Sequence, residues 1–216
     1  MIKTFITVMP EQPMGSLRET KYIAAEDERL FYDKEIRFPI LTAINAYAKE
    51  DDEIKIIVIT NEDLPQTEEY YNNYFIPALE EIKAEKNLKG LDVSKIIKVE
   101  AEISQGIVSN LKVAKALLDK IGDNEILHAC ITFGTKPLPI ILFMALNYAY
   151  KVRNNTDIET IVYGAKYWGG KKDNVDYIYD VTSLFYTNEM FMNLANAGVE
   201  DPAGKVKALY NILDEE

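Results

Sequence analysis

"EILHACITFGTKPLPIIL", residues 125–142, joins a continuous apolar run to an apolar helix through a short turn. The run has the length and hydrophobicity of a strand that is buried on both faces. Pro137 suits the first position of a helix, where its missing N–H costs nothing. Apolar residues then recur at helical spacing: Leu138, Ile141, Leu142, Ala145, Leu146 and Ala149. The stretch therefore predicts a β-strand that leads directly into an α-helix, as in α/β proteins.

The same alternation extends along the chain on both sides of this stretch. Strands are predicted at residues 2–9, 53–60, 95–103, 125–133, 158–165 and 174–182. Helical spacing predicts helices within residues 30–49, 70–82, 111–121 and 138–149 and over the last 30 residues, with Pro77 kinking or ending the second helix early. Short apolar strands joined by helices predict a parallel-sheet sandwich with helices on both faces and a C-terminal helical extension.

We expect one α/β domain over residues 1–185, since no repeat and no Gly/Ser-rich linker interrupts this region. Residues 186–216 are predicted to form a separate helical segment. That segment is either a dimer contact or the start of an effector region of which the rest lies outside this chain.

Composition excludes several classes of function. The chain has 24 basic and 35 acidic residues, a net charge of -11, which argues against binding long nucleic acid or an anionic membrane. No apolar run reaches the roughly 18 residues of a membrane span, and no signal peptide is recognisable, so we expect a cytoplasmic protein. The single cysteine, Cys130, and the single histidine, His128, lie in one apolar run and are expected to pack inside the strand.

The chain also lacks several common motifs. It contains no phosphate-binding G-x-x-x-x-G-K-[ST] sequence and no G-x-G-x-x-G after the first strand. It contains no H-E-x-x-H and no carboxylate–histidine cluster. These absences argue against a P-loop NTPase, a dinucleotide dehydrogenase and a metalloenzyme, and we expect neither a metal nor a cofactor.

In open α/β sheets, ligands bind beyond the carboxyl ends of the strands. Gly134, Thr135 and Lys136 lie at this point of a central strand, where a helix dipole, the free amides of the turn and first helical turn, and a fixed cation would form an anion site. The alternative is a plain helix start, in which Thr135 caps the helix and Lys136 is solvated.

Three other loops follow strands. The loop of residues 10–22 is longer than the usual 2–6 residues of a βα connection, which favours a functional loop. Ser104, Gln105 and Gly106 follow the third strand and either contact a ligand or belong to a helix start capped by Ser109 or Asn110. Beyond the fifth strand, Trp168 could stack on a base or cover an edge at a dimer contact. The further candidate residues in these loops are Gln12, Gly15, Ser16, Arg18, Tyr163 and Gly164.

Three stretches together resemble the CARF family, the CRISPR-associated Rossmann-fold ligand sensors of type III systems. They are "ITFGTKPLP" (131–139), "FITVMPEQPMGSLRETKY" (5–22) with "IRFPILTAI" (36–44), and "IETIVYGA" (158–165). The family's motif has an acidic or amide residue where this chain has Cys130, and often His where it has Phe133. The residues that match the family's pattern are Thr132, Gly134, Thr135 and Lys136 in the main motif and Gly15, Ser16 and Arg18 in the first loop.

The resemblance implies a Rossmann-like homodimer that binds a cyclic oligoadenylate, with the tetra-adenylate favoured over the hexa-adenylate. The implied role is a sensor in antiviral defence that acts on an effector domain or protein outside this chain. The alternative is a slow, metal-independent ring nuclease, in which a ribose 2′-OH attacks the adjacent phosphate, Lys136 stabilises charge and Ser16, Thr132 or Thr135 orients the hydroxyl. A regulator that binds an ordinary nucleotide is a third possibility. Phe133 completes the expected ligand-binding residues.

Overall fold

The computed structural model describes residues 1–165 and 175–213 as a mixed α/β protein. Its sheet has seven strands in the order β2-β7-β6-β5-β1-β3-β4. The strands are β1 (Ile2–Val8), β2 (Tyr22–Ala24), β3 (Glu53–Asn61), β4 (Ile97–Ala101), β5 (Glu125–Cys130), β6 (Asp157–Ala165) and β7 (Asp176–Asp180). Neighbouring strands run parallel except β6 and β7, which are antiparallel. The six predicted strands are thus present, and the sheet is mostly parallel.

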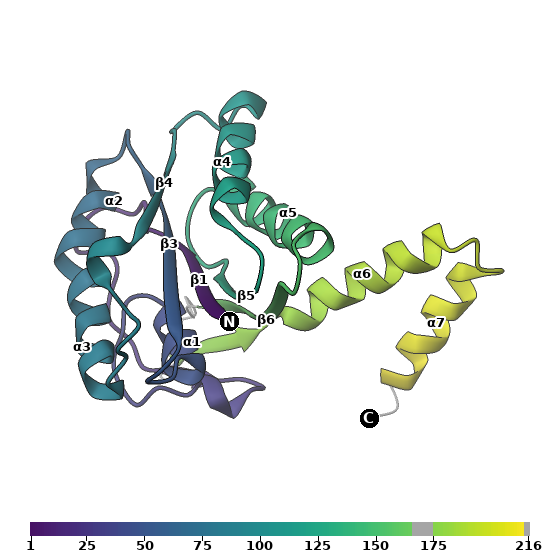
Figure 1. Cartoon of the computed structure of the whole chain (residues 1–216), viewed down its shortest axis with the longest axis horizontal. Coiled ribbons are helices and arrows are strands. Elements are labelled where there is room, and N and C mark those ends of the chain that lie inside the picture. Colours follow the sequence, from purple (N-terminus) through teal and green to yellow (C-terminus); the bar gives the residue numbers. More distant parts are fainter. Residues whose placement is uncertain (166–174, 214–216) are drawn as a thin grey trace. The chain divides into compact units, whose positions relative to one another are not determined.

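Helices flank this sheet, with α2 and α3 on one side and α4 and α5 on the other (Figure 1). The α-helices are α1 (Ile40–Tyr47), α2 (Pro65–Tyr70), α3 (Ile76–Lys86), α4 (Ile107–Lys120), α5 (Pro137–Val152), α6 (Thr182–Asn196) and α7 (Pro202–Leu213). Short helical turns lie at η1 (Glu28–Leu30), η2 (Tyr71–Phe75) and η3 (Val93–Lys95). As predicted, α5 begins at Pro137 immediately beyond the end of the central strand β5.

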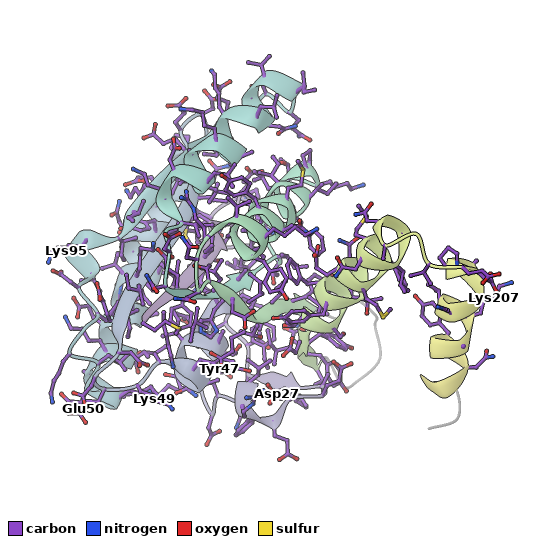
Figure 2. All side chains as sticks on the ribbon, turned by 45° about the vertical axis from the view of Figure 1, so that its right-hand side comes forward. Asp27, Tyr47, Lys49, Glu50, Lys95 and Lys207 are labelled. Carbon is purple, nitrogen blue, oxygen red and sulfur yellow. The ribbon has the colours of Figure 1, made fainter. Side chains whose placement is uncertain are left out.

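The centre of the core is aromatic. Phe5 of β1 pairs in register with His128 of β5, and the two rings are stacked with centroids 4.5 Å apart. The Tyr47 ring lies 4.9 Å from the His128 ring, and its hydroxyl donates to Asp27 over 2.9 Å (Figure 2). His128 and Cys130 are both buried, which confirms that they pack within the strand.

The region before α1 differs from the prediction. A helix was expected within residues 30–49, but α1 begins only at Ile40. The preceding segment is extended, because Pro39 disfavours helical geometry at Phe38. Thr20 and Ile36 exchange two backbone hydrogen bonds of 3.0 and 2.8 Å. The expected loop at residues 10–22 continues into β2, a strand of three residues that pairs with β7.

Pro77 does not end the helical segment: it lies in the first turn of α3, directly after a π-helical turn. A proline in that position cannot donate to the carbonyl of the residue four before it, and its ring clashes with that carbonyl. The helix accommodates the proline through the π-helical turn Tyr71–Phe75, in which the Ile76 N–H donates to the Tyr71 carbonyl. Helical residues then continue to Lys86. A change of winding, rather than an early end, accommodates the proline.

The chain divides into two compact units, residues 1–181 and residues 182–216. The division lies close to the expected boundary between residues 185 and 186. The second unit consists of α6 and α7, which contact each other through the rings of Phe191 and Tyr210, 6.3 Å apart. None of the helices in the described ranges combines the length and apolar character that crossing a bilayer requires.

Candidate functional site

The loop after β1 crosses the carboxyl edge of the sheet. At its start, the Tyr70 hydroxyl donates to the Pro13 carbonyl over 3.1 Å, which holds the loop against α2. At its end, Arg18 donates to Asp176, the first residue of β7. In the sheet, β1, β5 and β6 lie between β3 and β7, and β3 leads into α2. Residues 14–17 join the contact at α2 to the contact at β7, so they must pass over the ends of β1, β5 and β6.

Within this crossing, two of the predicted residues form a tight turn. Gly15 has a φ of +81°, a conformation that favours glycine. The Ser16 hydroxyl donates to the Pro13 carbonyl over 2.6 Å. Gln12 is exposed, and no described residue bonds to its side chain. Gly15 therefore shapes the crossing, while Ser16 and Gln12 present polar atoms at the carboxyl edge.

The turn between β5 and α5 is closely packed on the end of β1. Gly134 has a φ of +95°, and a Cβ atom there would lie 2.8 Å from Leu138 Cδ1 and 2.9 Å from Val8 Cγ1. Both the backbone conformation and the available space therefore require glycine. The turn that carries Thr135 and Lys136 is fixed by this packing.

The free amides lie in this turn and not in the first turn of the helix, where they were also expected. Pro137 and Pro139 have no N–H, and the Leu138 N–H donates to the Thr135 carbonyl over 2.9 Å. By contrast, the backbone N–H groups of residues 133–136 have no acceptor among the described residues, whereas the Thr132 N–H points to the Cys130 sulfur. Consecutive free amides next to a positive-φ glycine can bind an anion. The sequence alone could have indicated that the first helical turn has few free amides, because Pro139 as well as Pro137 lacks an N–H.

Lys136 supplies the cation of this turn. Its side chain is exposed, and it forms no ion pair or hydrogen bond with any residue in the described ranges. Lys136 is also the N-cap residue of α5, and no side chain caps the helix. The alternative prediction that Thr135 caps the helix is therefore wrong. A free ammonium group and free amides occur together, which suits an anion.

Two other predicted site residues, Thr132 and Gly164, form a hydrogen bond between the ends of β5 and β6. The Thr132 hydroxyl accepts hydrogen bonds from the Gly164 N–H over 2.8 Å and from the Cys130 thiol over 3.3 Å. Burial raises the pKa of that thiol, so it stays protonated. Phe133 is buried, and only its backbone is available to a ligand, whereas the Tyr163 side chain is exposed. Thr132 and Gly164 thus have structural roles whether or not a ligand binds.

The loop before α4 approaches the β5–α5 turn. Ser104, Gln105 and Thr135 line one small pocket between them. Its remaining lining residues are Glu11, Ala101, Glu102, Ser109, Asn110, Val113 and Leu138. Gly106 has an ordinary φ of -68° and is itself the N-cap residue. The backbone conformation at residue 106 thus does not require glycine. The prediction that Ser109 or Asn110 caps the helix is wrong, because the N-cap is Gly106.

Two carboxylates in this pocket were not predicted. Glu102 accepts hydrogen bonds from Lys112 over 2.6 Å and from Ser109 over 2.7 Å. The bond from Lys112 is the main cause that lowers the pKa of Glu102. Glu11 accepts from Asn61 over 3.1 Å. The pocket therefore offers acceptors for hydroxyl or amino groups, whereas the adjacent turn offers donors.

Exposed apolar side chains on the two helices that follow these loops were also missed. They lie on the neighbouring helices α4 and α5, which begin at the two loops just described (Figure 1). Ile107 is 76% exposed at the start of α4, and exposed apolar side chains recur one turn apart along α5. We define the α4–α5 patch as Ile107, Val108, Leu111, Ile140 and Met144. Apolar clusters of this kind mark interaction surfaces.

No family model matches the chain, and no curated protein matches it significantly. Among the described residues, no three His, Cys, Asp or Glu side chains are grouped as metal ligands. Trp168, for which stacking or a dimer contact was considered, lies outside the described residues.

Proposed function

We propose that this protein is a CARF-type sensor with a Rossmann-like fold that binds a cyclic oligoadenylate, with the tetra-adenylate as the favoured ligand. The β5–α5 turn carries this proposal. Lys136 has no partner there among the described residues, and the N–H groups of residues 133–136 are free within the described ranges. A phosphodiester matches this combination, because charge-assisted hydrogen bonds from amides and an ammonium group are the strong ones.

The polar groups at the mouth of the pocket beside the turn favour a nucleotide over a free phosphate, and the pocket itself, of about 10 Å³, holds no more than one water. Glu11 and Glu102 would repel a second phosphate, but they can accept from ribose hydroxyls or the adenine amino group. Ser104 and Gln105 add neutral donors and acceptors at the same place. The donors at the turn would bind a phosphate, and the acceptors at the pocket would bind the neighbouring nucleoside. Phosphates and nucleosides alternate in the same way along a nucleic-acid chain.

The α4–α5 patch supports a two-fold homodimer. Since α5 begins directly after Lys136, contact through α5 near its start would bring the turns of two protomers toward one axis. A ring with two-fold symmetry fits such an arrangement, because each protomer can bind an equivalent half. The sensor would then act on an effector domain or protein outside this chain.

The proposal is tested by incubating the full chain with labelled cyclic tetra-adenylate, cyclic hexa-adenylate and AMP, without metal. Binding and intactness of the rings are followed together. We expect the tetra-adenylate to bind most tightly. Binding of AMP alone would support an ordinary nucleotide regulator and contradict the proposal. Cleavage of the bound ring would add the ring-nuclease activity to the sensor.

A further inference from the structure

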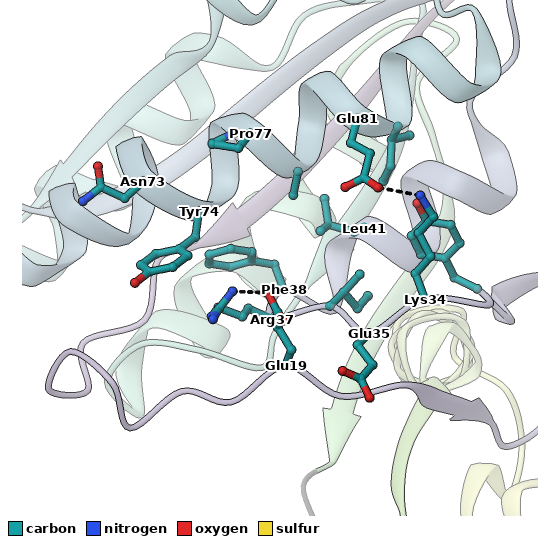
Figure 3. A pocket seen from close by; sticks show the side chains of 14 residues that line it. Glu19, Lys34, Glu35, Arg37, Phe38, Leu41, Asn73, Tyr74, Pro77 and Glu81 are labelled. Carbon is teal, nitrogen blue, oxygen red and sulfur yellow. Dashed lines mark hydrogen bonds and ion pairs between the residues drawn. The ribbon is translucent and has the colours of Figure 1, made fainter.

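A second cavity, of about 630 Å³, lies between residues 32–38 and helix α3 (Figure 3). This volume is in the range of small-molecule sites. We call it the α3 groove. Its lining residues are Glu19, Tyr32, Lys34, Glu35, Ile36, Arg37, Phe38, Leu41, Asn73, Tyr74, Pro77, Ala78, Glu81 and Ile82. None of them belongs to the site proposed above, so the α3 groove is argued independently of that proposal.

The floor of the α3 groove consists of apolar residues that are packed into the core. Ile36, Phe38 and Leu41 come from the segment before and within α1, and all three are buried. The opposite wall contains Pro77 and Ala78, which follow the π-helical turn. π-helical turns are frequent at functional sites. The apolar surface of the α3 groove that a flat group can reach is therefore that of Pro77 and Ala78.

An ion pair lies toward each end of the groove (Figure 3). At one end, Arg37 pairs with Glu19, and its guanidinium lies 4.2 Å from the centre of the Tyr74 ring. At the other end, Lys34 pairs with Glu81 over 2.6 Å. Lys34 also pairs with a second carboxylate on α3, so both cations of the groove are already neutralised.

One carboxylate remains. Glu35 has no ion-pair or hydrogen-bond partner within the described part of the chain. The lining therefore carries three carboxylates, from Glu19, Glu35 and Glu81, against two paired cations. A phosphate-bearing ligand would meet acceptors and a net negative charge there. A cation would be attracted instead, and its apolar part would meet Pro77 and Ala78.

We propose that the α3 groove binds an organic cation, namely a primary amine that carries a flat aromatic body. The aromatic body contacts Pro77 and Ala78 on the α3 wall, and the ammonium group pairs with Glu35 at the rim. The shape of the groove selects the ring and its charge selects the amine.

Tryptamine and indole-3-propionate test this assignment, because they share the indole ring and differ in the sign of the charge. Both are titrated into the full chain, and the backbone amide signals of Asn73 and Tyr74 are followed by NMR. We expect tryptamine to shift these signals and to bind at least tenfold more tightly than indole-3-propionate. Absence of tryptamine binding at millimolar concentration, or equal binding of both compounds, would overturn the proposal.

Two variants locate the site. Glu35→Gln should weaken tryptamine binding at least threefold, and Ala78→Phe should abolish it by filling the α3 groove. Glu80→Gln is the matched control, because it makes the same change on α3, the helix that forms one wall, at a residue that does not line the groove. Equal losses in Glu35→Gln and Glu80→Gln would overturn the assignment even if Ala78→Phe failed to fold.

Discussion

Arg18 donates two hydrogen bonds, of 2.9 and 3.0 Å, to the two carboxylate oxygens of Asp176. The Asp176 side chain is fully buried, whereas that of Arg18 is 48% exposed. The pair ties the loop after β1 to the edge of the sheet. Arg18 was predicted to contact the ligand, but its bidentate partner gives it a structural role in the protein without ligand.

Replacing Arg18 should therefore destabilise the protein. Arg18→Ala leaves a buried carboxylate without its ion-pair partner, a change that costs about 3–5 kcal/mol when both groups are buried. Because Arg18 is half exposed, we expect about 1–3 kcal/mol in urea unfolding. Adding Asp176→Asn should recover part of the loss, since it removes the buried charge. A loss below about 0.5 kcal/mol, the level of ordinary surface changes, would contradict this role.

Gly134 should be far less replaceable than Gly106. Gly134→Ala forces a left-handed conformation on alanine and introduces a contact 2.8 Å from Leu138 Cδ1. We expect a loss of about 2 kcal/mol or more in unfolding free energy. Gly106→Ala has an ordinary φ and only Ser104 Oγ at 3.4 Å, so its cost should stay within about 1 kcal/mol. Similar losses in both variants would show that the β5–α5 turn is not specially packed.

Much of the fold could be predicted because its strands are short, apolar and separated by helical periodicity. The strand containing Leu127 and the helix beginning at Pro137 are set by local sequence. β2 could not be predicted, because a strand as short as Tyr22–Ala24 depends on pairing with the distant β7. The helical spacing of Ile36 with Ile40 was misleading, since Pro39 and long-range pairing keep Ile36 extended.

The candidate site was only partly predictable for the same reason. Gly134 and Lys136 stand out locally, and the structure places both in the turn after β5. The pairing of Arg18 with Asp176 spans 158 residues, so no local pattern reveals it. The α4–α5 patch was missed because helical spacing does not tell which apolar side chains stay uncovered.

His128 should make the protein sensitive to acid. Burial lowers the pKa of His128 from 6.5 to about 3; neither ring nitrogen has a hydrogen-bond partner among the described residues, and the nearest carboxylate oxygen, of Glu159, lies 3.5 Å from Nε2. Between these values the unfolded chain binds more protons, so the stabilising contribution is complete above pH 6.5 and is lost as pH falls toward 3. At about 1.4 kcal/mol per pH unit, the cost between pH 6.5 and 4.5 is of the order of 2–3 kcal/mol.

The measurement compares urea unfolding of the wild type and His128→Phe at pH 7 and pH 4.5. The stability lost on acidification should be smaller in the variant by about this amount, whatever its absolute stability. Carboxylates titrate in both proteins, so the difference isolates the histidine. Equal losses in the two proteins would contradict a buried, neutral His128.

A charge in the α4–α5 patch should disrupt dimerisation. Met144→Glu places a carboxylate in a surface that the proposed dimer desolvates, so we expect at least a tenfold weaker dimer by analytical ultracentrifugation. Phe31→Glu is the control, because Phe31 is also an exposed apolar residue but lies outside the patch. An unchanged oligomeric state in Met144→Glu, or the same loss in Phe31→Glu, would contradict an interface at this patch.

The most direct test of the ligand site is calorimetric titration of cyclic tetra-adenylate into the wild type, Lys136→Ala and Lys49→Ala. Lys49 is an exposed lysine just before β3, at the opposite edge of the sheet (Figure 2). The account predicts one ring per two chains, at least tenfold weaker binding in Lys136→Ala on the scale of about 1.5–3 kcal/mol for a charged hydrogen bond, and wild-type affinity in Lys49→Ala. Undetectable binding to the wild type, or unchanged affinity in Lys136→Ala, would contradict it.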